Sequence, residues 1–413
     1  MKSFFRYISL LFVLLFSVEL FAVKRFYSEN SVLSQGKWVK ISVSEEGVYQ
    51  LTAKELSNMG FSNPRQVHLH GYGGELLDEN FTTASYVDDL PEIPTYWDES
   101  SQKLVFYLRG TIGFKPNTNA KTKVLTPLFF EENYTSNNSY YFLTENSAKP
   151  LRYAKEEDAD FDVEESTVED IYKYQSITIK KFDETNLLGS GRNWYGEIYE
   201  PNQRKTYTLF FKNMIVGDTA SFFCQVLSSA NIATNFNIYT DLGNSDYQKC
   251  TVSALSNGAQ VSTSTLQGVE LQSNSSSVSF DLKYSCTQKS GRGYVDYIIG
   301  TANSYLDANT VNFIRRIKSL DYEYSRFHFG KAKTNDVFLD VSDVEHIYVP
   351  EVSFSGDSAF VVVRNAVTPN LQRFVNFSPS NVYPSPSVVG DVKNQNLHAM
   401  KDFEYVIITP TEF

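Results

Sequence analysis

The chain has 413 residues, a length that predicts two to four domains. Apolar residues make up 42% and aromatic residues 15% of the sequence, which is enough for hydrophobic cores and argues against wholesale disorder. The formal net charge of −11 argues against a general nucleic-acid binder, because such proteins meet phosphates with a positive field. Three cysteines over this length exclude a disulfide-dense scaffold.

The N-terminus has the features of a targeting segment. Lys2 and Arg6 precede an apolar run from Ile8 to Phe16, and Ala22 stands at a plausible cleavage point. This order predicts a secretory signal peptide over residues 1–22, because the run is too short to cross a bilayer. Cleavage would leave the mature chain near −12. We therefore expect a protein that is exported and is either soluble or held at a surface by partners.

Residues 23–155 are predicted to form an N-terminal β-rich domain. Val39, Ile41 and Val43 alternate with polar residues, a period of two that indicates a half-buried strand. Thr52 and Glu55 have the spacing of a capping box and predict a short helix. Further strands are predicted at Val67–His70, Lys103–Leu108 and Ser139–Leu143.

Residues 156–170 are predicted to be an acidic linker. Seven of the ten residues from Glu156 to Glu165 are acidic, and such a run repels itself and stays solvated. Asp158 to Glu169 also has the length of a calcium-binding loop, but Val163 stands where the sharp turn needs glycine. A solvated linker is the preferred interpretation.

Two β regions are predicted after the linker. Residues 171–330 carry short strands with polar turns between them, which is typical of a β-sandwich of jelly-roll type, and Ser262–Ser277 is expected to be a long loop. Residues 331–400 form a smaller β region, with a proline-rich loop at Tyr383–Pro386. The expected sandwich strands include Thr206–Phe211, Phe222–Leu227, Phe236–Tyr239 and Val278–Tyr284, and Phe360–Val363 is expected in the smaller region.

Residues 401–413 have a different pattern. Tyr405–Thr409 is a continuous apolar run, as in strands that are buried on both faces of a parallel sheet. We expect it to be the first strand of an α/β domain that is cut short at Phe413.

Two groups of side chains are candidates for metal binding or acid–base chemistry. His68 and His70 lie two residues apart on one strand face, a spacing that can bind a metal, but the sequence identifies no third ligand. Asp88, Asp89 and Glu92 surround two prolines and could act as paired carboxylates, although a surface loop is the simpler interpretation. Neither group is assigned as a catalytic, cofactor or metal site.

The cysteines and one glycine-rich segment are interpreted structurally. Cys224 lies in an alternating strand pattern and is expected to be a buried thiol, whereas Cys250 and Cys286 are free to pair or to remain reduced. The segment Gly189–Glu197 is expected to close one end of the sandwich. Its Trp194 and Tyr195 leave open an alternative function, a non-enzymatic surface protein that binds glycan or protein partners.

Several segments, taken in order, resemble the N-terminal half of the type IX secretion system sortases of the Bacteroidetes, which carry a gingipain-like cysteine peptidase domain. The joint order of the segments is more specific than any one of them. They are Ser31–Trp38, Gly47–Leu51, His70–Gly74, Asp88–Pro94, Gly191–Glu197, Tyr383–Pro386, Asn394–His398 and Tyr405–Pro410.

The resemblance implies a role in protein secretion at the outer membrane. The complete family member would cleave the C-terminal signal domain from secreted cargo and attach the cargo to surface lipopolysaccharide through a thioester. Its partners would be outer-membrane and surface components of an attachment complex. The family's catalytic His and Cys lie in the peptidase domain, and no segment here matches them. We therefore expect this chain to be a non-catalytic, inactive region without catalytic residues, cofactor or metal.

Overall fold

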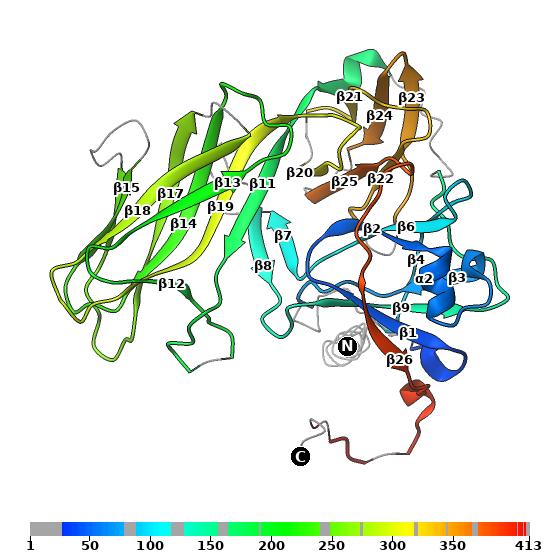
Figure 1. Cartoon of the computed structure of the whole chain (residues 1–413), viewed down its shortest axis with the longest axis horizontal. Coiled ribbons are helices and arrows are strands. Elements are labelled where there is room, and N and C mark those ends of the chain that lie inside the picture. Colours follow the sequence, from blue (N-terminus) through cyan, green and yellow to red (C-terminus); the bar gives the residue numbers. More distant parts are fainter. Residues whose placement is uncertain are drawn as a thin grey trace, which may run out of the picture.

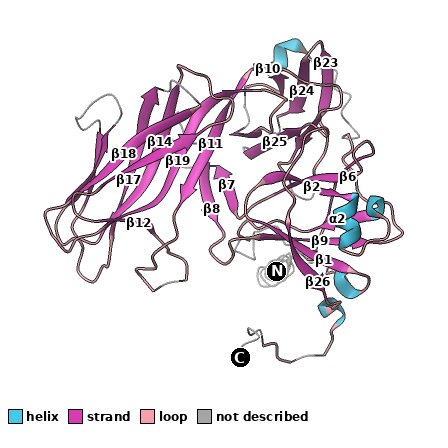
Figure 2. Cartoon of the chain, in the orientation of Figure 1, coloured by secondary structure: helices cyan, strands magenta, loops and turns pink. Residues whose placement is uncertain are grey.

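The computed structural model describes residues 27–409 except for eleven internal gaps. The gaps are 78–87, 117–127, 156–163, 190, 240–247, 273–275, 318–320, 344–345, 366–370, 403 and 408. The signal peptide expected over residues 1–22 lies outside the described residues. Strands dominate the described residues, and the helices among them are short (Figure 2). The expected mainly β fold is therefore confirmed.

The first part of the chain forms the N-terminal unit, which lies at the lower right of Figure 1. One sheet has the strand order β26-β1-β9-β3-β4, a second has the order β2-β6-β5, and β7 pairs with β8. The strands of this unit are β1 (Trp38–Val43), β2 (Gly47–Thr52), β3 (Val67–His70), β4 (Glu92–Ile93), β5 (Tyr96–Asp98), β6 (Lys103–Leu108), β7 (Ile112–Pro116), β8 (Leu128–Glu132), β9 (Ser139–Glu145) and β26 (Ser387–Val392). Its helical segments are η1 (Val32–Ser34), α2 (Ala53–Asn58) and η2 (Pro64–Gln66).

Helix α2 begins and ends where local sequence signals place it. The Thr52 side chain accepts a hydrogen bond from the Glu55 N–H, and the Glu55 carboxylate accepts one from the Thr52 N–H. This capping box satisfies two N–H groups that would otherwise be orphaned at the helix start. Gly60 follows the helix with a φ of +90°, a conformation that glycine adopts without a Cβ penalty.

The second unit is a β-sandwich, at the left of Figure 1. One sheet has the order β11-β19-β14-β17, with β12 also paired to β19, and the facing sheet has the order β13-β18-β15-β16. Aromatic residues fill the core between them, and the rings of Phe222 and Phe280 stack 3.9 Å apart. The strands are β11 (Lys173–Lys181), β12 (Gly196–Tyr199), β13 (Arg204–Phe210), β14 (Thr219–Ser228), β15 (Thr234–Tyr239), β16 (Gln248–Val252), β17 (Ser262–Gln272), β18 (Ser277–Ser285) and β19 (Gly293–Tyr305).

A third unit lies above the N-terminal unit in Figure 1. It combines a sheet of order β10-β21-β24-β23 with a sheet of order β20-β25-β22, and a separate apolar core includes Phe327 and Phe374. Its elements are η3 (Glu165–Thr167), β10 (Val168–Ile171), β20 (Phe313–Ile317), β21 (Tyr324–Phe329), β22 (Val337–Asp340), β23 (Glu351–Ser355), β24 (Ser358–Arg364) and β25 (Leu371–Phe377).

The sheets cross the domain boundaries expected from sequence. β10 begins inside the expected linker 156–170 and pairs in parallel with β21. β20 and β21 precede residue 330 but belong to the third unit. β26, expected in the region 331–400, pairs with β1 at the edge of the N-terminal sheet. The difference arises because a strand's partner is chosen by long-range pairing, which composition along the chain does not encode.

The prediction of a long loop over Ser262–Ser277 is wrong for most of this segment. β17 occupies Ser262–Gln272 and pairs antiparallel with β14. It is the edge strand of its sheet, and Leu266 is buried in the core. An edge strand with one solvated face needs few apolar residues, and threonine favours strands, so the Ser/Thr-rich composition was misleading.

The strand expected at Tyr405–Thr409 is not formed by its described residues. Tyr405, Val406 and Ile407 are 84%, 64% and 78% exposed and carry no strand assignment. A strand is stabilised only where a neighbour accepts its backbone hydrogen bonds. Before this tail, η4 (Leu397–Ala399) follows β26 at the lower end of the molecule (Figure 1).

Charged side chains join the three units. Arg373 on β25 forms an ion pair with Glu75 at 2.5 Å, linking the third unit to the N-terminal unit. Lys181 on β11 lies 3.7 Å from Glu132 on β8 and links the sandwich to the β7–β8 hairpin. Val375 on β25 is also part of the N-terminal core. The units are therefore connected through packed side chains as well as through the chain itself.

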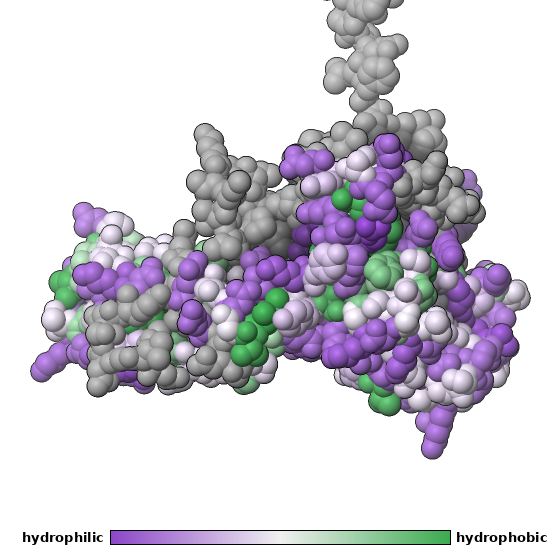
Figure 3. Space-filling view, turned by 90° about the horizontal axis from the view of Figure 1, so that it is seen from above, coloured by the Kyte–Doolittle hydropathy of each residue, from purple (hydrophilic) through white to green (hydrophobic). Residues whose placement is uncertain are grey.

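The surface seen from above is largely polar. In Figure 3, hydrophilic colours cover most of the described residues, and hydrophobic colour is confined to small separate patches. Small patches of this kind are normal for soluble domains. The described residues seen in this view form no broad apolar face.

Candidate functional site

The two histidines expected to share a strand face do so. Both lie on β3, which is hydrogen-bonded to β9 on one side and to β4 on the other. His68 is 2% exposed and His70 is 9% exposed. Alternate residues of a strand point the same way, so the sheet presents the two imidazoles side by side.

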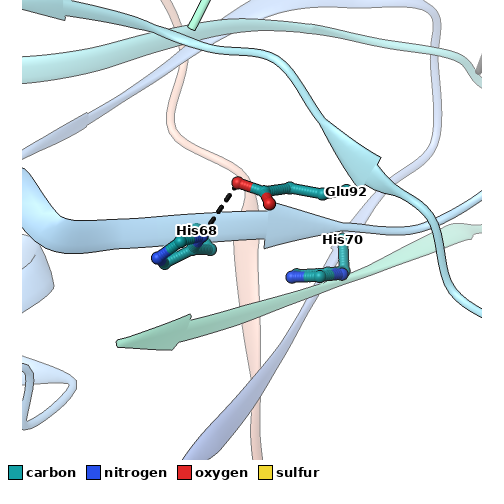
Figure 4. A group of neighbouring side chains, drawn as sticks. All are labelled: His68, His70 and Glu92. Carbon is teal, nitrogen blue, oxygen red and sulfur yellow. Dashed lines mark hydrogen bonds and ion pairs between the residues drawn. The ribbon is translucent and has the colours of Figure 1, made fainter. Parts of the chain in front are cut away.

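Glu92 completes a cluster with these histidines (Figure 4). It lies on β4 directly opposite His70, and its Oε1 accepts a hydrogen bond of 2.8 Å from His68 Nδ1. The backbone N–H of Leu151 also donates to Oε1, at 2.7 Å. Glu92 is therefore held in a fixed position beside both rings.

His70 has a defined tautomer. Its Nδ1 lies 3.1 Å from the carbonyl oxygen of Leu90, and a carbonyl only accepts, so Nδ1 carries the hydrogen. Burial lowers the pKa of His70, which favours the neutral ring. A neutral ring with Nδ1–H has its lone pair on Nε2, the nitrogen available to a ligand.

The cluster has the donor set of a metal site. One ligand atom from each of His68, His70 and Glu92 lies within 4.8 Å of the others. Two imidazoles and one carboxylate suit zinc and similar divalent transition metals. The sequence pattern identified both histidines but grouped Glu92 with Asp88 and Asp89, and only the pairing of β3 with β4 brings Glu92 to the histidines as a third candidate ligand.

Asp88 and Asp89 have a different role from Glu92. Asp88 accepts a hydrogen bond from the backbone N–H of Ser28 at 2.6 Å, and Asp89 accepts one from the N–H of Val32 at 2.7 Å. The two carboxylates thus hold the N-terminal segment against the loop before β4. In these contacts the two aspartates have a structural role.

The same N-terminal segment contacts the motif at Asn394–His398. Asn394 Nδ2 donates to the carbonyl oxygens of Leu33 and Gly36 at 3.0 and 2.9 Å. His398 Nδ1 lies 2.9 Å from the carbonyl oxygen of Ser28. Two segments of the sequence resemblance that are far apart in the chain therefore lie together in the fold.

Two charged side chains of the segment Gly189–Glu197 bind other parts of the fold. The Arg192 guanidinium stacks 4.8 Å from the ring centroid of Tyr134, and Glu197 forms an ion pair with Lys205 at 3.0 Å. Tyr195 is buried, whereas Trp194 is 41% exposed. Of the two residues that suggested a glycan-binding surface, only Trp194 is presented to solvent.

All three cysteines are free and buried. Burial raises the pKa of the Cys224 thiol, and Cys224 is fully buried as expected. Cys250 Sγ contacts Ser264 Oγ at 3.1 Å, and Cys286 Sγ contacts the Gln288 carbonyl oxygen at 3.4 Å. Cys250 and Cys286, which the sequence left free to pair or to remain reduced, are therefore two separate thiols. None of the three has the exposed, electropositive setting of a reactive thiolate.

The acidic segment is only partly described. Residues 156–163, which hold most of the calcium-like spacing, lie outside the described residues. Glu169, its last expected position, forms an ion pair with Arg316 at 2.8 Å. Its carboxylate is thus already paired with a cation from another strand.

None of the helices in the described residues is long and apolar enough to cross a bilayer.

Comparison with known proteins identifies the fold. No family model matches the chain, and no curated protein matches it. Among solved structures, dimeric latent PorU from Porphyromonas gingivalis matches with a TM-score of 0.78 over 91% of this chain, at 22% identity. The chain has a PorU-like fold. The match covers 35% of the PorU chain, so this chain spans about a third of that protein's length.

Other structural matches are far weaker. A CBM36-1 domain of a multidomain xylanase from the hindgut metagenome of Trinervitermes trinervoides has a TM-score of 0.21 at 14% identity, and covers 30% of this chain and 95% of that domain. The infectious bursal disease virus VP2 subviral particle has a TM-score of 0.19 at 8% identity, over 86% of this chain and 84% of that protein. Scores this low carry no functional argument, so any functional interpretation depends on the PorU-like fold alone.

Proposed function

We propose that this chain is the non-catalytic N-terminal region of a type IX secretion system sortase. The observation that carries the proposal is the PorU-like fold, which extends over 91% of the chain with a TM-score of 0.78. A match of this extent includes all three units and their arrangement, and not only a sandwich that many unrelated proteins share.

The contacts between the two ends of the fold support this proposal. Ser31–Trp38 and Asn394–His398 belong to the sequence segments that resemble the sortase family, and they bind each other through side-chain amides and backbone groups. Because the two segments pack against each other, each one depends on the other for its position in the fold.

The proposed role is to support the chemistry of a peptidase domain. The complete enzyme would cleave the C-terminal signal domain of cargo and attach the cargo to surface lipopolysaccharide, a reaction that needs a nucleophilic cysteine and a base. The three cysteines of this chain are buried and unsuited to that step. The N-terminal region would instead hold and orient the peptidase domain against its partners.

The proposal includes a location and a set of partners. The mature protein would be exported and associated with the outer membrane at the cell surface. It would contact outer-membrane and surface components of an attachment complex, together with cargo proteins that carry C-terminal signal domains. The predicted signal peptide supports export.

Deletion of the gene in its native host tests the function. We expect secreted cargo to accumulate with its C-terminal signal domain uncleaved and to be lost from the cell surface, as read by mass spectrometry of surface and culture fractions. Complementation with the intact gene should restore cleavage. Normal cargo processing and attachment in the deletion strain would contradict the proposal.

A second candidate is a surface protein that binds glycan or protein through the sandwich. The exposed indole of Trp194 is the observation that favours it. Binding of the wild-type chain to a glycan array, lost in Trp194→Ala and combined with normal cargo processing in the deletion strain, would support this candidate over the sortase role.

A further inference from the structure

We propose that His68, His70 and Glu92 form a binding site for a divalent transition-metal cation, with Zn²⁺ as the best-fitting ion, which fastens the loop before β4 to the sheet. This inference is independent of the sortase proposal, because it depends only on the three side chains and their surroundings. The site would be structural and would be located between β3 and β4 (Figure 4).

The geometry allows one ion to reach all three residues. His68 Nδ1 and Glu92 Oε1 lie 2.8 Å apart, and one donor atom from each residue lies within 4.8 Å of the others. Zinc binds imidazole nitrogen and carboxylate oxygen at about 2.0–2.2 Å, so small side-chain rotations bring the donors to a common centre. On binding, the ion would replace the hydrogen that His68 Nδ1 now donates to Glu92, and the imidazole would carry its hydrogen on Nε2 instead.

His70 is oriented for this role before an ion arrives. The hydrogen bond from Nδ1 to the Leu90 carbonyl fixes the tautomer and leaves the Nε2 lone pair free to coordinate. Metal-binding histidines commonly donate their other ring nitrogen to a backbone carbonyl or a carboxylate in this way. The edge-on ring of Trp38, 5.1 Å from the His70 ring, packs against the same imidazole.

The environment of His68 also differs from that of a fully satisfied core histidine. The side chain is 2% exposed, yet its Nε2 has no hydrogen-bond partner among the described residues. Buried polar atoms are usually paired, so the unpartnered Nε2 sets this ring apart from an ordinary core histidine.

The donor set selects the class of ion. Two imidazoles and one carboxylate suit zinc and its neighbours, whereas Ca²⁺ and Mg²⁺ prefer sites made of oxygen ligands. Glu92 supplies one negative charge against the two positive charges of the ion. Three protein ligands leave one coordination position for water or another donor.

Metal binding would have a mechanical consequence. Leu90 and Glu92 lie in the same short segment as Asp88 and Asp89, which bind the backbone of Ser28 and Val32. An ion that fixes Glu92 and His70 would therefore also immobilise the anchor of the N-terminal segment. Through that segment the effect extends to the Asn394–His398 motif.

Zinc titration of the full chain tests the site. The chain is stripped with a chelator, dialysed and titrated with ZnCl₂, with native mass spectrometry for stoichiometry and calorimetry for affinity. We expect one ion per chain, and at least a tenfold loss of affinity in Glu92→Gln and in His70→Asn. The matched control is His346→Asn, because His346 is 79% exposed and pairs only with Asp343 among the contacts described for it. It should bind like wild type.

Two further measurements keep the test independent of variant stability. Co²⁺ bound to the wild-type chain should give visible absorption bands typical of a nitrogen- and oxygen-coordinated site, and Zn²⁺ should displace them. Hydrogen exchange of residues 88–94 should slow by at least tenfold when Zn²⁺ is added. Failure of the wild-type chain to bind one ion, equal affinity in the folded site variants, or unchanged exchange at 88–94 would overturn the proposal.

Discussion

The side-chain amide oxygen of Asn396 accepts a hydrogen bond of 2.9 Å from the backbone N–H of Ser31, a residue 365 positions earlier in the chain. Asn396 also donates from Nδ2 to Asn30 Oδ1 at 2.7 Å. A single side chain therefore joins the beginning and the end of the described fold, next to the edge where β26 pairs with β1.

Removal of this side chain should loosen the N-terminal segment. Asn396→Ala deletes both hydrogen bonds, and each contributes about 1 kcal/mol. We expect faster hydrogen exchange across residues 28–36 with little change in the cores. Lys393→Ala, which alters an exposed neighbour, is the control and should exchange like wild type. Equal exchange in Asn396→Ala and wild type would show that the segment is held by its other contacts alone.

The sandwich core should be sensitive to loss of one aromatic ring. Phe280 is 1% exposed and stacks on Phe222, so Phe280→Ala leaves a cavity and should lower the free energy of unfolding by about 3–5 kcal/mol. Phe210→Ala removes the same side chain from a residue that is 68% exposed and should change stability by less than about 0.5 kcal/mol. Urea unfolding monitored by fluorescence measures both. Similar losses in the two variants would contradict the packing of Phe280 between the two sheets.

Asp170 on β10 pairs with Arg326 and His328, and we expect acid to remove the stability that these contacts contribute. Hydrogen bonds from Arg326, and then from His328, lower the pKa of Asp170 from 3.8 to about 2. A carboxyl group with a depressed pKa in the folded state stabilises the protein above its unfolded pKa, and the contribution is lost as pH falls from about 4 to about 2. Because Asp170 is 36% exposed, solvent screening reduces the contribution to about 1 kcal/mol.

Asp170→Asn should therefore be less stable than wild type at neutral pH, and the difference should disappear towards pH 2. Urea unfolding at a series of pH values measures this convergence. Asp391→Asn, which neutralises an exposed residue on β26, should follow the wild-type curve. A constant difference between Asp170→Asn and wild type over the whole range would rule out the linkage.

Cys224 should resist thiol reagents in the folded chain. It is fully buried on β14, and burial raises its pKa, so little reactive thiolate forms. Under native conditions a maleimide probe should leave Cys224 unlabelled, and denaturant should expose it to rapid modification, as read by peptide mass spectrometry. Rapid native labelling at Cys224 would mean that β14 opens readily.

Short-range sequence signals predict much of the local structure of this protein. Strands were predicted at Val67–His70 and Lys103–Leu108 with the bounds observed, and the Thr52–Glu55 capping box predicted the start of α2. These signals are short-range, because capping and side-chain alternation depend on residues only a few positions apart. The mainly β class was predicted from the same signals.

Which segments lie beside one another depends on long-range pairing in the folded chain. Glu92 joins His68 and His70 because β4 pairs with β3, although the sequence grouped it with the nearby aspartates. Ser262–Gln272 is a strand because β14 offers a partner, and Tyr405–Ile407 is exposed because no described strand lies beside it. Pairing across a sheet joins residues tens to hundreds of positions apart, and its free energy depends on a partner that no local pattern identifies.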